Sequence, residues 1–339
     1  MKRYIFSLIA IMVVFSACKK DAVNKSTPNS KSVPVTFNVG YSQSVGSFNG
    51  ARNLAKLTGH NLAADSTLKA NAKTLYVGVY QSDGNQLFLT KQLSTDTSFG
   101  KMNFNLPAGN YTVVFAAGQE NLFMSGSTLS RTDIVYSVEV GNGNFDRRWH
   151  STFFQKINLT VGSTGVVQNI SLNRIDAQIV IDIEDAIPSN VKFLFAQVTD
   201  NKSQGGANNT DLVALTGAPA LGSNDGLLYV RTNSDTAVTP GTKNTRFCVT
   251  LLDTSNPYTV SIYAYDQLPL VTSPGGNRDF SPMGNIIGFF TTSTVTVQTG
   301  HQTILSGKLF GGNGTTNTGG FQMTVNPTWD PTTTTIPFQ

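Results

Sequence analysis

The fold of this chain is decided by residues 170–186, ISLNRIDAQIVIDIEDA, where a period-two apolar pattern changes register part-way along. Before position 173 the apolar residues are even-numbered, Ile170 and Leu172, and after it they are odd-numbered, up to Ile183. Successive residues of a strand point to opposite faces, so one uninterrupted strand cannot bring both sets into the same core. One extra residue near position 173 resolves the conflict, either as a β-bulge or as a passage from one core to the next. We interpret it as the junction between two domains, with residues 175–183 as the first strand of the second.

The polar residues of that strand share the opposite parity, and we expect Gln178, Asp182 and Glu184 to point outward. Asp176 belongs to the same set, so two of these carboxylates could lie at the separation of a general acid and base. The pattern favours a solvated outer face over that alternative. Only a cleft with converging carboxylates, such as Asp182 and Glu184, would restore the hypothesis of an enzyme.

The composition points to a secreted β-rich protein. With 339 residues the chain is long enough for two ordinary domains, each with its own core. Charged residues make up 13% and aromatic residues 10%, and outside the extreme N-terminus no segment of ten residues keeps a helical apolar period. We therefore predict an all-β fold of two tandem antiparallel β-sandwich domains, residues 33–170 and 171–339.

Short alternating segments separated by turn residues support this fold, and residues 107–110, PAGN, form a strong hairpin turn between two of them. The strands predicted in the first domain are residues 33–39, 75–80, 86–93, 102–106, 111–116, 134–140 and 153–161. Those predicted in the second are residues 175–183, 192–198, 227–231, 246–252, 258–265, 286–292, 295–298, 303–309 and 322–325. Residues 40–73 are predicted as a functional or mobile loop, or as a surface excursion with a short helix.

Residues 1–17 have the features of a cleaved export signal. Lys2 and Arg3 precede an apolar run, and small residues stand just before Cys18. The arrangement resembles a bacterial lipoprotein signal, which is cut before a cysteine that is then acylated; the alternative is an ordinary secretory signal that contains a Cys. Two or three acyl chains, at about 0.8 kcal/mol per buried methylene, would hold the protein in a membrane. Residues 18–32 would then be a lipidated, solvated tether, and we expect a surface-exposed lipoprotein of the outer membrane.

The sequence contains no motif for catalysis or for a cofactor. His60, His150 and His301 are scattered and have no His or Cys at a metal-ligand spacing, so we predict no metal site. Cys248 has apolar neighbours and is predicted to be a buried free thiol. The 24 basic and 20 acidic residues are dispersed without a basic stripe, which argues against a nucleic-acid partner. We predict that the protein is not an enzyme.

Several segments carry a resemblance to a known family. After the lipoprotein signal come NLPAGNYTVVFAAG (105–118), SLNRIDAQIVIDIEDAIPSNVKFL (171–194) and TILSGKLF with FQMTVNPTW (303–310 and 321–329). In this order they resemble the fimbrillin and fimbrium-anchor lipoproteins of the Bacteroidetes. The resemblance covers the whole chain and implies a pair of transthyretin-like β-sandwiches. It also implies a role in type V surface fimbriae and cell adhesion, as an anchor, accessory or stalk subunit that binds other fimbrial subunits.

In the family that the chain resembles, stalk subunits are cut after an arginine, which removes the first strand and opens a groove. An extended terminal segment of the next subunit fills that groove by donor-strand exchange. By this resemblance residues 33–39 would be the removable strand and Arg52 the processing site. The candidate strand-exchange residues are Phe321, Met323, Val325 and Trp329. Anchor subunits keep their lipid, and we favour such an uncut component.

Two alternatives stay open. One is a polymerising stalk or tip fimbrillin cut after Arg52. The other is a surface lipoprotein that binds glycans through exposed aromatic residues such as Trp149, Tyr229 or Tyr265. Aromatic side chains aligned on one exposed face would favour glycan binding, whereas burial of all of them would count against it. A ligand on a host or bacterial surface would be a further partner.

Overall fold

The structure is a computed structural model. It describes residues 31–41, 66–119, 122–136, 138–141, 144–146, 150–200, 212–215, 218–219, 227–231, 237–252, 254, 257–268, 284–310 and 321–326. Strands dominate these ranges, and the all-β prediction is confirmed. The helical elements described are α2 (Ser66–Asn71), inside the predicted loop 40–73, and the 3-10 helix η1 (Leu129–Arg131). No helix in the described ranges is both long and apolar enough to cross a lipid bilayer.

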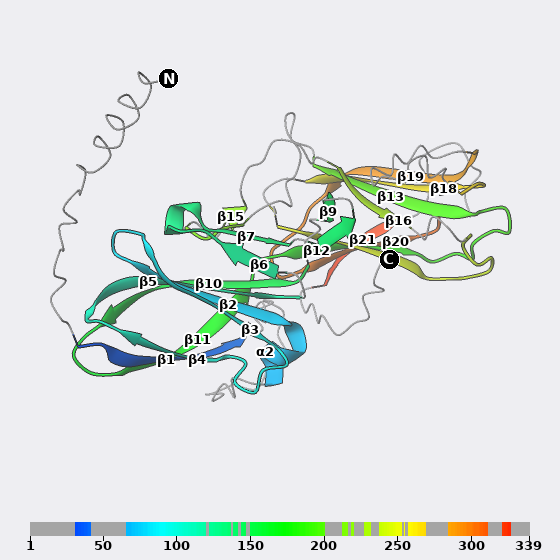
Figure 1. The fold of residues 1–339 in the computed structure, drawn as a ribbon. Coiled ribbons are helices and arrows are strands. Elements are labelled where there is room, and N and C mark those ends of the chain that lie inside the picture. The colour runs from blue at the N-terminus through cyan, green and yellow to red at the C-terminus, as the bar shows by residue number, and fades with distance from the viewer. Residues whose placement is uncertain are drawn as a thin grey trace, which may run out of the picture.

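The N-terminal sandwich consists of two sheet layers around one core (Figure 1). One layer has the order β3-β2-β5-β10 and the other β11-β1-β4, and they are continuous only where Phe153 and Phe154 pair with Arg174 and Asn173. The strands are β1 (Val33–Tyr41), β2 (Thr74–Gln81), β3 (Gln86–Leu93), β4 (Lys101–Leu106), β5 (Gly109–Gly118), β10 (Thr152–Val161) and β11 (Val166–Arg174). Alternate residues, such as Val35, Phe37 and Val39, face the core and are fully buried.

The C-terminal sandwich repeats this plan with two four-stranded sheets, β17-β12-β20-β21 and β16-β13-β18-β19. Its core lies between them and includes Ile179, Ile181 and Ile183 of β12. The strands are β12 (Ala177–Ile183), β13 (Phe193–Asp200), β16 (Leu227–Arg231), β17 (Thr245–Leu251), β18 (Tyr258–Tyr265), β19 (Ile286–Val295), β20 (Gln302–Gly307) and β21 (Gln322–Asn326).

The two sandwiches share one topology. The strands of each sandwich can be numbered from one to seven in chain order. One sheet of each sandwich then contains strands in the order 4-1-7, and the other in the order 3-2-5-6. In this numbering the N-terminal strands are β1, β2, β3, β4, β5, β10 and β11, and they correspond in turn to β12, β13, β16, β17, β18, β19 and β20. In each, the first strand is parallel to the seventh and antiparallel to the fourth. Strand β21 is an eighth strand, antiparallel to β20, and the described part of the N-terminal sandwich has no equivalent of it.

Each sandwich carries an insertion, and the two insertions pair with each other. The N-terminal one holds β6 (Leu122–Ser125), β7 (Asp133–Tyr136), β8 (Val138–Gly141) and β9 (Asn144–Asp146). The C-terminal one holds β14 (Leu212–Val213) and β15 (Ala218–Pro219). Strands β7 and β14 are antiparallel neighbours, which produces the shared sheet β15-β14-β7-β6.

The register change near position 173 is a passage between two cores, as the sequence indicated. Ile170 and Leu172 of β11 are buried in the N-terminal core, whereas Ile179 and Ile181 are buried in the C-terminal core. Strand β11 ends at Arg174 and β12 begins at Ala177. The division of the chain into domains at residues 170 and 171 stays a prediction.

Three expectations were wrong. The predicted strand 134–140 is two strands in different sheets, β7 and β8, and β19 continues to Val295, so that residues 296–298 are not a strand. The expected solvated face of β12 is also wrong, because Gln178 and Asp182 are 3% and 7% exposed. Gln302 Nε2 donates to Gln178 Oε1, and Arg246 Nε donates to Asp182 Oδ2, so cross-strand neighbours replace water at these two oxygens, while Asp182 Oδ1 is buried without a hydrogen-bond partner among the described residues. Only Glu184 of the set is exposed.

Candidate subunit-binding edges and the junction between the sandwiches

Three of the predicted strand-exchange residues lie in or beside β21, which is the edge strand of its sheet. Its five residues pair with β20 from Gln302 to Ser306, and its other edge has no strand beside it in the described part of the chain. Met323 and Val325 point toward the core side but are 48% and 49% exposed. The backbone ladder therefore supplies most of the attachment of β21, which is a typical property of an added strand.

Phe321 precedes β21 and anchors it. Its ring stacks on Phe290 of β19 with centroids 4.3 Å apart and an interplanar angle of 28°. It also packs against the C-terminal core, closing the corner between the two sheets. The fourth predicted residue, Trp329, lies outside the described residues, as do Cys18 and Arg52.

Strand β1, the predicted removable strand, is central in its layer. It pairs with β11 over seven positions and with β4 over six. Val33, Val35, Phe37 and Val39 are at most 6% exposed. Each such side chain contributes about 1.5–3 kcal/mol by its burial, so removal of β1 would forfeit roughly 6–12 kcal/mol of apolar stabilisation in addition to two ladders.

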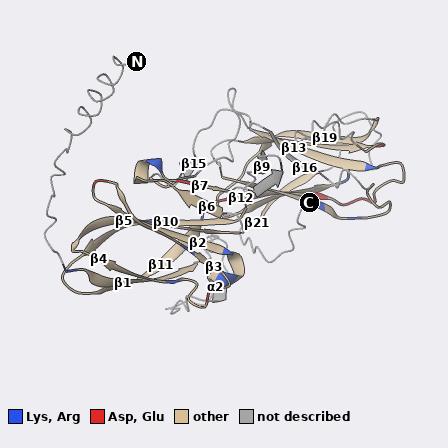
Figure 2. Ribbon diagram, in the orientation of Figure 1, with Lys and Arg blue, Asp and Glu red and all other residues tan. Residues whose placement is uncertain are grey.

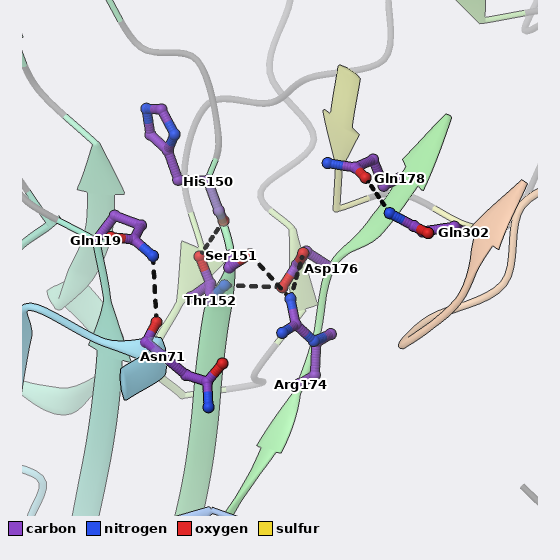
Figure 3. Close-up of polar contacts among 9 residues, drawn as sticks. All are labelled: Asn71, Gln119, His150, Ser151, Thr152, Arg174, Asp176, Gln178 and Gln302. Atoms are coloured by element: carbon purple, nitrogen blue, oxygen red, sulfur yellow. Dashed lines mark hydrogen bonds and ion pairs between the residues drawn. The ribbon is translucent and has the colours of Figure 1, made fainter. Parts of the chain in front are cut away.

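The connector between β11 and β12 is bonded to both sandwiches, and Figure 3 shows the contacts of Asp176 with Thr152 and Arg174 on the N-terminal side. The Ile175 N–H donates to the Thr152 carbonyl on β10 at 3.0 Å, and the Gly300 N–H donates to the Asp176 carbonyl at 2.8 Å. The Asp176 carboxylate accepts from the Thr152 N–H at 2.7 Å and lies 3.4 Å from Arg174 Nη1. One backbone segment is thus bonded to both sandwiches.

The Arg174–Asp176 ion pair is buried, with side chains 5% and 0% exposed. The Arg174 guanidinium lies 4.7 Å from the centroid of the Phe153 ring and donates to Ser151 Oγ at 2.9 Å. Burial raises the pKa of Asp176 to about 6, and the nearby Arg174 charge and the Thr152 N–H lower it only in part. Sequence reasoning missed this pair because parity alone placed Asp176 on a solvated face.

A third apolar cluster joins the sandwiches. Tyr76, Tyr80, Val114, Ala116, Leu122, Met124, Leu129, Ile134 and Phe154 of the N-terminal half form it together with Ala214 and Leu252 of the C-terminal half. The Ala214 N–H donates to the Thr132 carbonyl at 3.0 Å, and Lys156 Nζ donates to the Leu215 carbonyl. The junction therefore combines a shared sheet, a shared core and a buried ion pair.

The other candidate sites offer less chemistry. Tyr265 is 6% exposed and packs with Phe193 and Tyr263 on the outer face of the β13-β18-β19 layer, so it presents little surface for stacking on a sugar. The structure does not describe the side chains of Trp149 and Tyr229. Cys248 is a free thiol that is partly buried, not fully buried as predicted, and this desolvation raises its pKa to about 11.

Charged groups are sparse on the described strands (Figure 2). Among the described residues, no three His, Cys, Asp or Glu side chains gather as a metal site would require.

The comparison with protein families decides which of these features matter. A model of the fimbrillin-A associated anchor proteins Mfa1 and Mfa2 matches residues 31–335, which include both sandwiches and β21. The chain belongs to this family. Its members are structural proteins of fimbriae. The family resemblance seen in the sequence segments is therefore confirmed. None of the curated proteins matches the chain.

Several solved structures match most of the chain. The fimbrial anchor protein Mfa2 from Porphyromonas gingivalis is 11% identical, with 88% of this chain and 98% of that chain covered and a TM-score of 0.47. A candidate polysaccharide-binding protein from Bacteroides thetaiotaomicron is 13% identical, with 88% and 96% covered and a TM-score of 0.48. The tip fimbrial protein Mfa3 from Porphyromonas gingivalis, truncated at its C-terminus, is 11% identical, with 87% and 99% covered and a TM-score of 0.39.

Proposed function

We propose that this protein is a lipid-anchored component of surface fimbriae that holds other fimbrial subunits at the outer membrane. The family match over residues 31–335 carries the proposal. Acyl chains on Cys18 would form the membrane attachment, and residues 18–32 would be the tether. Contacts with other subunits would use exposed strand edges such as β21, with Phe321, Met323, Val325 and Trp329 as the strand-exchange segment.

The position of β1 supports a chain that is not cut after Arg52. The strand is paired on both sides and contributes four core side chains, so the N-terminal sandwich with β1 in place has no open groove at that position. A retained β1 also keeps the folded part covalently continuous with Cys18. Cleavage at Arg52 would separate the lipid from the sandwiches, which is the opposite of what an anchor requires.

The junction supports a load-bearing role. A subunit that connects a long fibre to a membrane transmits force through its own fold. The shared sheet and the adjoining apolar cluster join the two halves, and the connector is bonded to Thr152 of the N-terminal half and to Gly300 of the C-terminal half. Relative motion of the sandwiches would break these contacts, so the two halves should behave as one stiff unit.

Intact mass and N-terminal peptide mapping of the protein from its own outer membrane test the proposal. The expected mature chain begins at an acylated Cys18. A chain that begins at Asn53 would replace this conclusion with the alternative of a polymerising stalk or tip subunit.

A matched pair of cysteine variants tests the anchoring itself. Cys18→Ala should release the protein and its fimbriae into the medium, whereas Cys248→Ala, at the other cysteine, should leave them attached. Fimbriae that stay attached in a strain lacking the whole protein would refute the anchoring role.

A further inference from the structure

The two sandwiches differ at one position of their shared topology. In the C-terminal sandwich, the seventh strand β20 has a neighbour on each edge, β12 and β21. In the N-terminal sandwich, the seventh strand β11 pairs with β1 along residues 166–172. On its other edge only Asn173 and Arg174 are paired, with β10. Among the described residues, the eighth position of the N-terminal sandwich is therefore empty from Val166 to Leu172.

The empty edge is long enough for a strand like β21. Strand β21 occupies five ladder positions on β20, whereas the edge of β11 that lacks a neighbour spans seven residues. Val167 is 73% exposed and Asn169 is exposed, so the outer face beside this edge is open to solvent. An unpaired row of backbone donors and acceptors is a ready template for another extended chain.

The core is also less well covered at this corner. Ile157 of β10 and Val166 of β11 pack against the N-terminal core but are only partly buried. The equivalent corner of the C-terminal sandwich lies between β19 and β20. There Phe321 stacks on Phe290 and packs against the C-terminal core, immediately before β21. In the C-terminal half, the eighth-strand position is thus filled by a large apolar residue followed by an antiparallel strand with alternating apolar side chains.

We propose that the free edge of β11, residues 166–172, binds an extended segment of another fimbrial subunit, antiparallel to β11. The inference rests on the proposed fimbrial function for the identity of the partner. Backbone bonds of the bound segment would complete the sheet, and its core-facing apolar side chains would cover the partly buried corner that includes Ile157 and Val166. Because β1 stays in its layer, this site needs no cleavage of the chain.

A different subunit is favoured over a second copy as the source of the segment. Strand β21 of a second copy is already paired along all five of its residues with its own β20. Its release would remove Phe321 from the C-terminal core, so exchange between copies would gain one ladder and lose another.

Photo-crosslinking in intact fimbriated cells tests the proposal. The crosslinking residue p-benzoylphenylalanine replaces Val167, and the matched control replaces Lys101, which is exposed on β4 at the opposite edge of the same layer. The expected product at Val167 is an adduct whose mapped peptide is an extended segment of a different fimbrial subunit, at least tenfold above the control. Adducts only with a second copy or with the chain's own residues, or no excess over the control, would overturn it.

Hydrogen exchange provides an independent readout. Amides in residues 166–172 should exchange at least about tenfold more slowly in assembled fimbriae than in the isolated protein, while residues 101–106 of β4 keep their rate. Equal rates at β11 in both states would overturn the inference. If removal of the whole protein detaches the fimbriae but β11 shows neither adduct nor protection, only this inference fails. Fimbriae that stay attached without the protein mean that the proposed function has failed.

Discussion

Asp176 makes the stability of the junction depend on pH. Its carboxyl group is fully buried, and burial raises its pKa from 3.8 to about 6. A folded-state pKa above the unfolded value means that the folded protein binds the proton more tightly. The contribution to stability is therefore fully present below about pH 4 and is lost as the pH rises through 6.

The magnitude follows from the size of the shift. About two pKa units correspond to roughly 3 kcal/mol at 1.36 kcal/mol per unit, and about 2 kcal/mol of this is regained between pH 7 and pH 4. Asp176→Asn removes the charge but keeps an oxygen that can accept from the Thr152 N–H. The free energy of unfolding of the native protein, relative to this variant, should thus increase by about 2 kcal/mol on acidification from pH 7 to pH 4.

Urea denaturation of both proteins at pH 7 and pH 4 measures this difference, and the subtraction cancels the titration of all other groups. Asp83→Asn is the matched control, because two contacts with Asn85 lower the pKa of Asp83 and give its effect the opposite sign. A difference between native protein and Asp176→Asn that stays constant with pH, or falls on acidification, would show that the Asp176 carboxylate is not desolvated.

Three further outcomes check the packing. Leu252→Ala truncates a 4% exposed side chain of the shared apolar cluster, so the free energy of unfolding should fall by about 2–4 kcal/mol. Spectroscopic probes placed in each sandwich should then report two separate unfolding transitions in urea. Phe321→Ala should lower the free energy of unfolding by about 2 kcal/mol, because the stack on Phe290 is lost. Met323→Ala, which truncates a half-exposed side chain in the same strand region, should lower it by less than about 1 kcal/mol in the same assay. Cys248, with its raised pKa of about 11, should react slowly with iodoacetamide at pH 8 until the protein is unfolded; labelling of the native protein as fast as of the unfolded protein would contradict the raised pKa.

The period-two pattern predicted most of the sandwich strands because many of them, such as β1 and β4, bury alternate residues, although β2 and β12 are buried on both faces. The parity change around position 173 was enough to predict the passage between two cores, since Ile170 and Ile179 cannot serve the same core from one strand. The pattern failed for residues 134–140, where β7 and β8 belong to different sheets. Alternation shows that a segment is extended but not which strand it pairs with.

The contacts at the junction could not be predicted from sequence patterns, for a different reason. Strands β14 and β15 have two residues each, too short to produce a periodic signal, and the pairing of β14 with β7 joins segments about eighty positions apart. The Asp176 carboxylate contacts Thr152 of β10 and Arg174 of β11, which lie together only once these two strands have paired. A single sequence contains the residues of such a site but not their proximity.

The shared topology gives the insertions a mechanical meaning. Two sandwiches linked only by residues 175 and 176 would move about a two-residue hinge, because such a short connector fixes distance but not orientation. The insertion with β6 and β7 lies between the fifth and sixth strands of one sandwich, and that with β14 and β15 lies between the second and third strands of the other. Their pairing adds a non-covalent connection to the covalent one, and two connections resist bending more than one does. A pull along the chain is then shared between the β7–β14 ladder and the Arg174–Asp176 connector, so weakening either one alone should lower the force at which the halves separate without unfolding either sandwich.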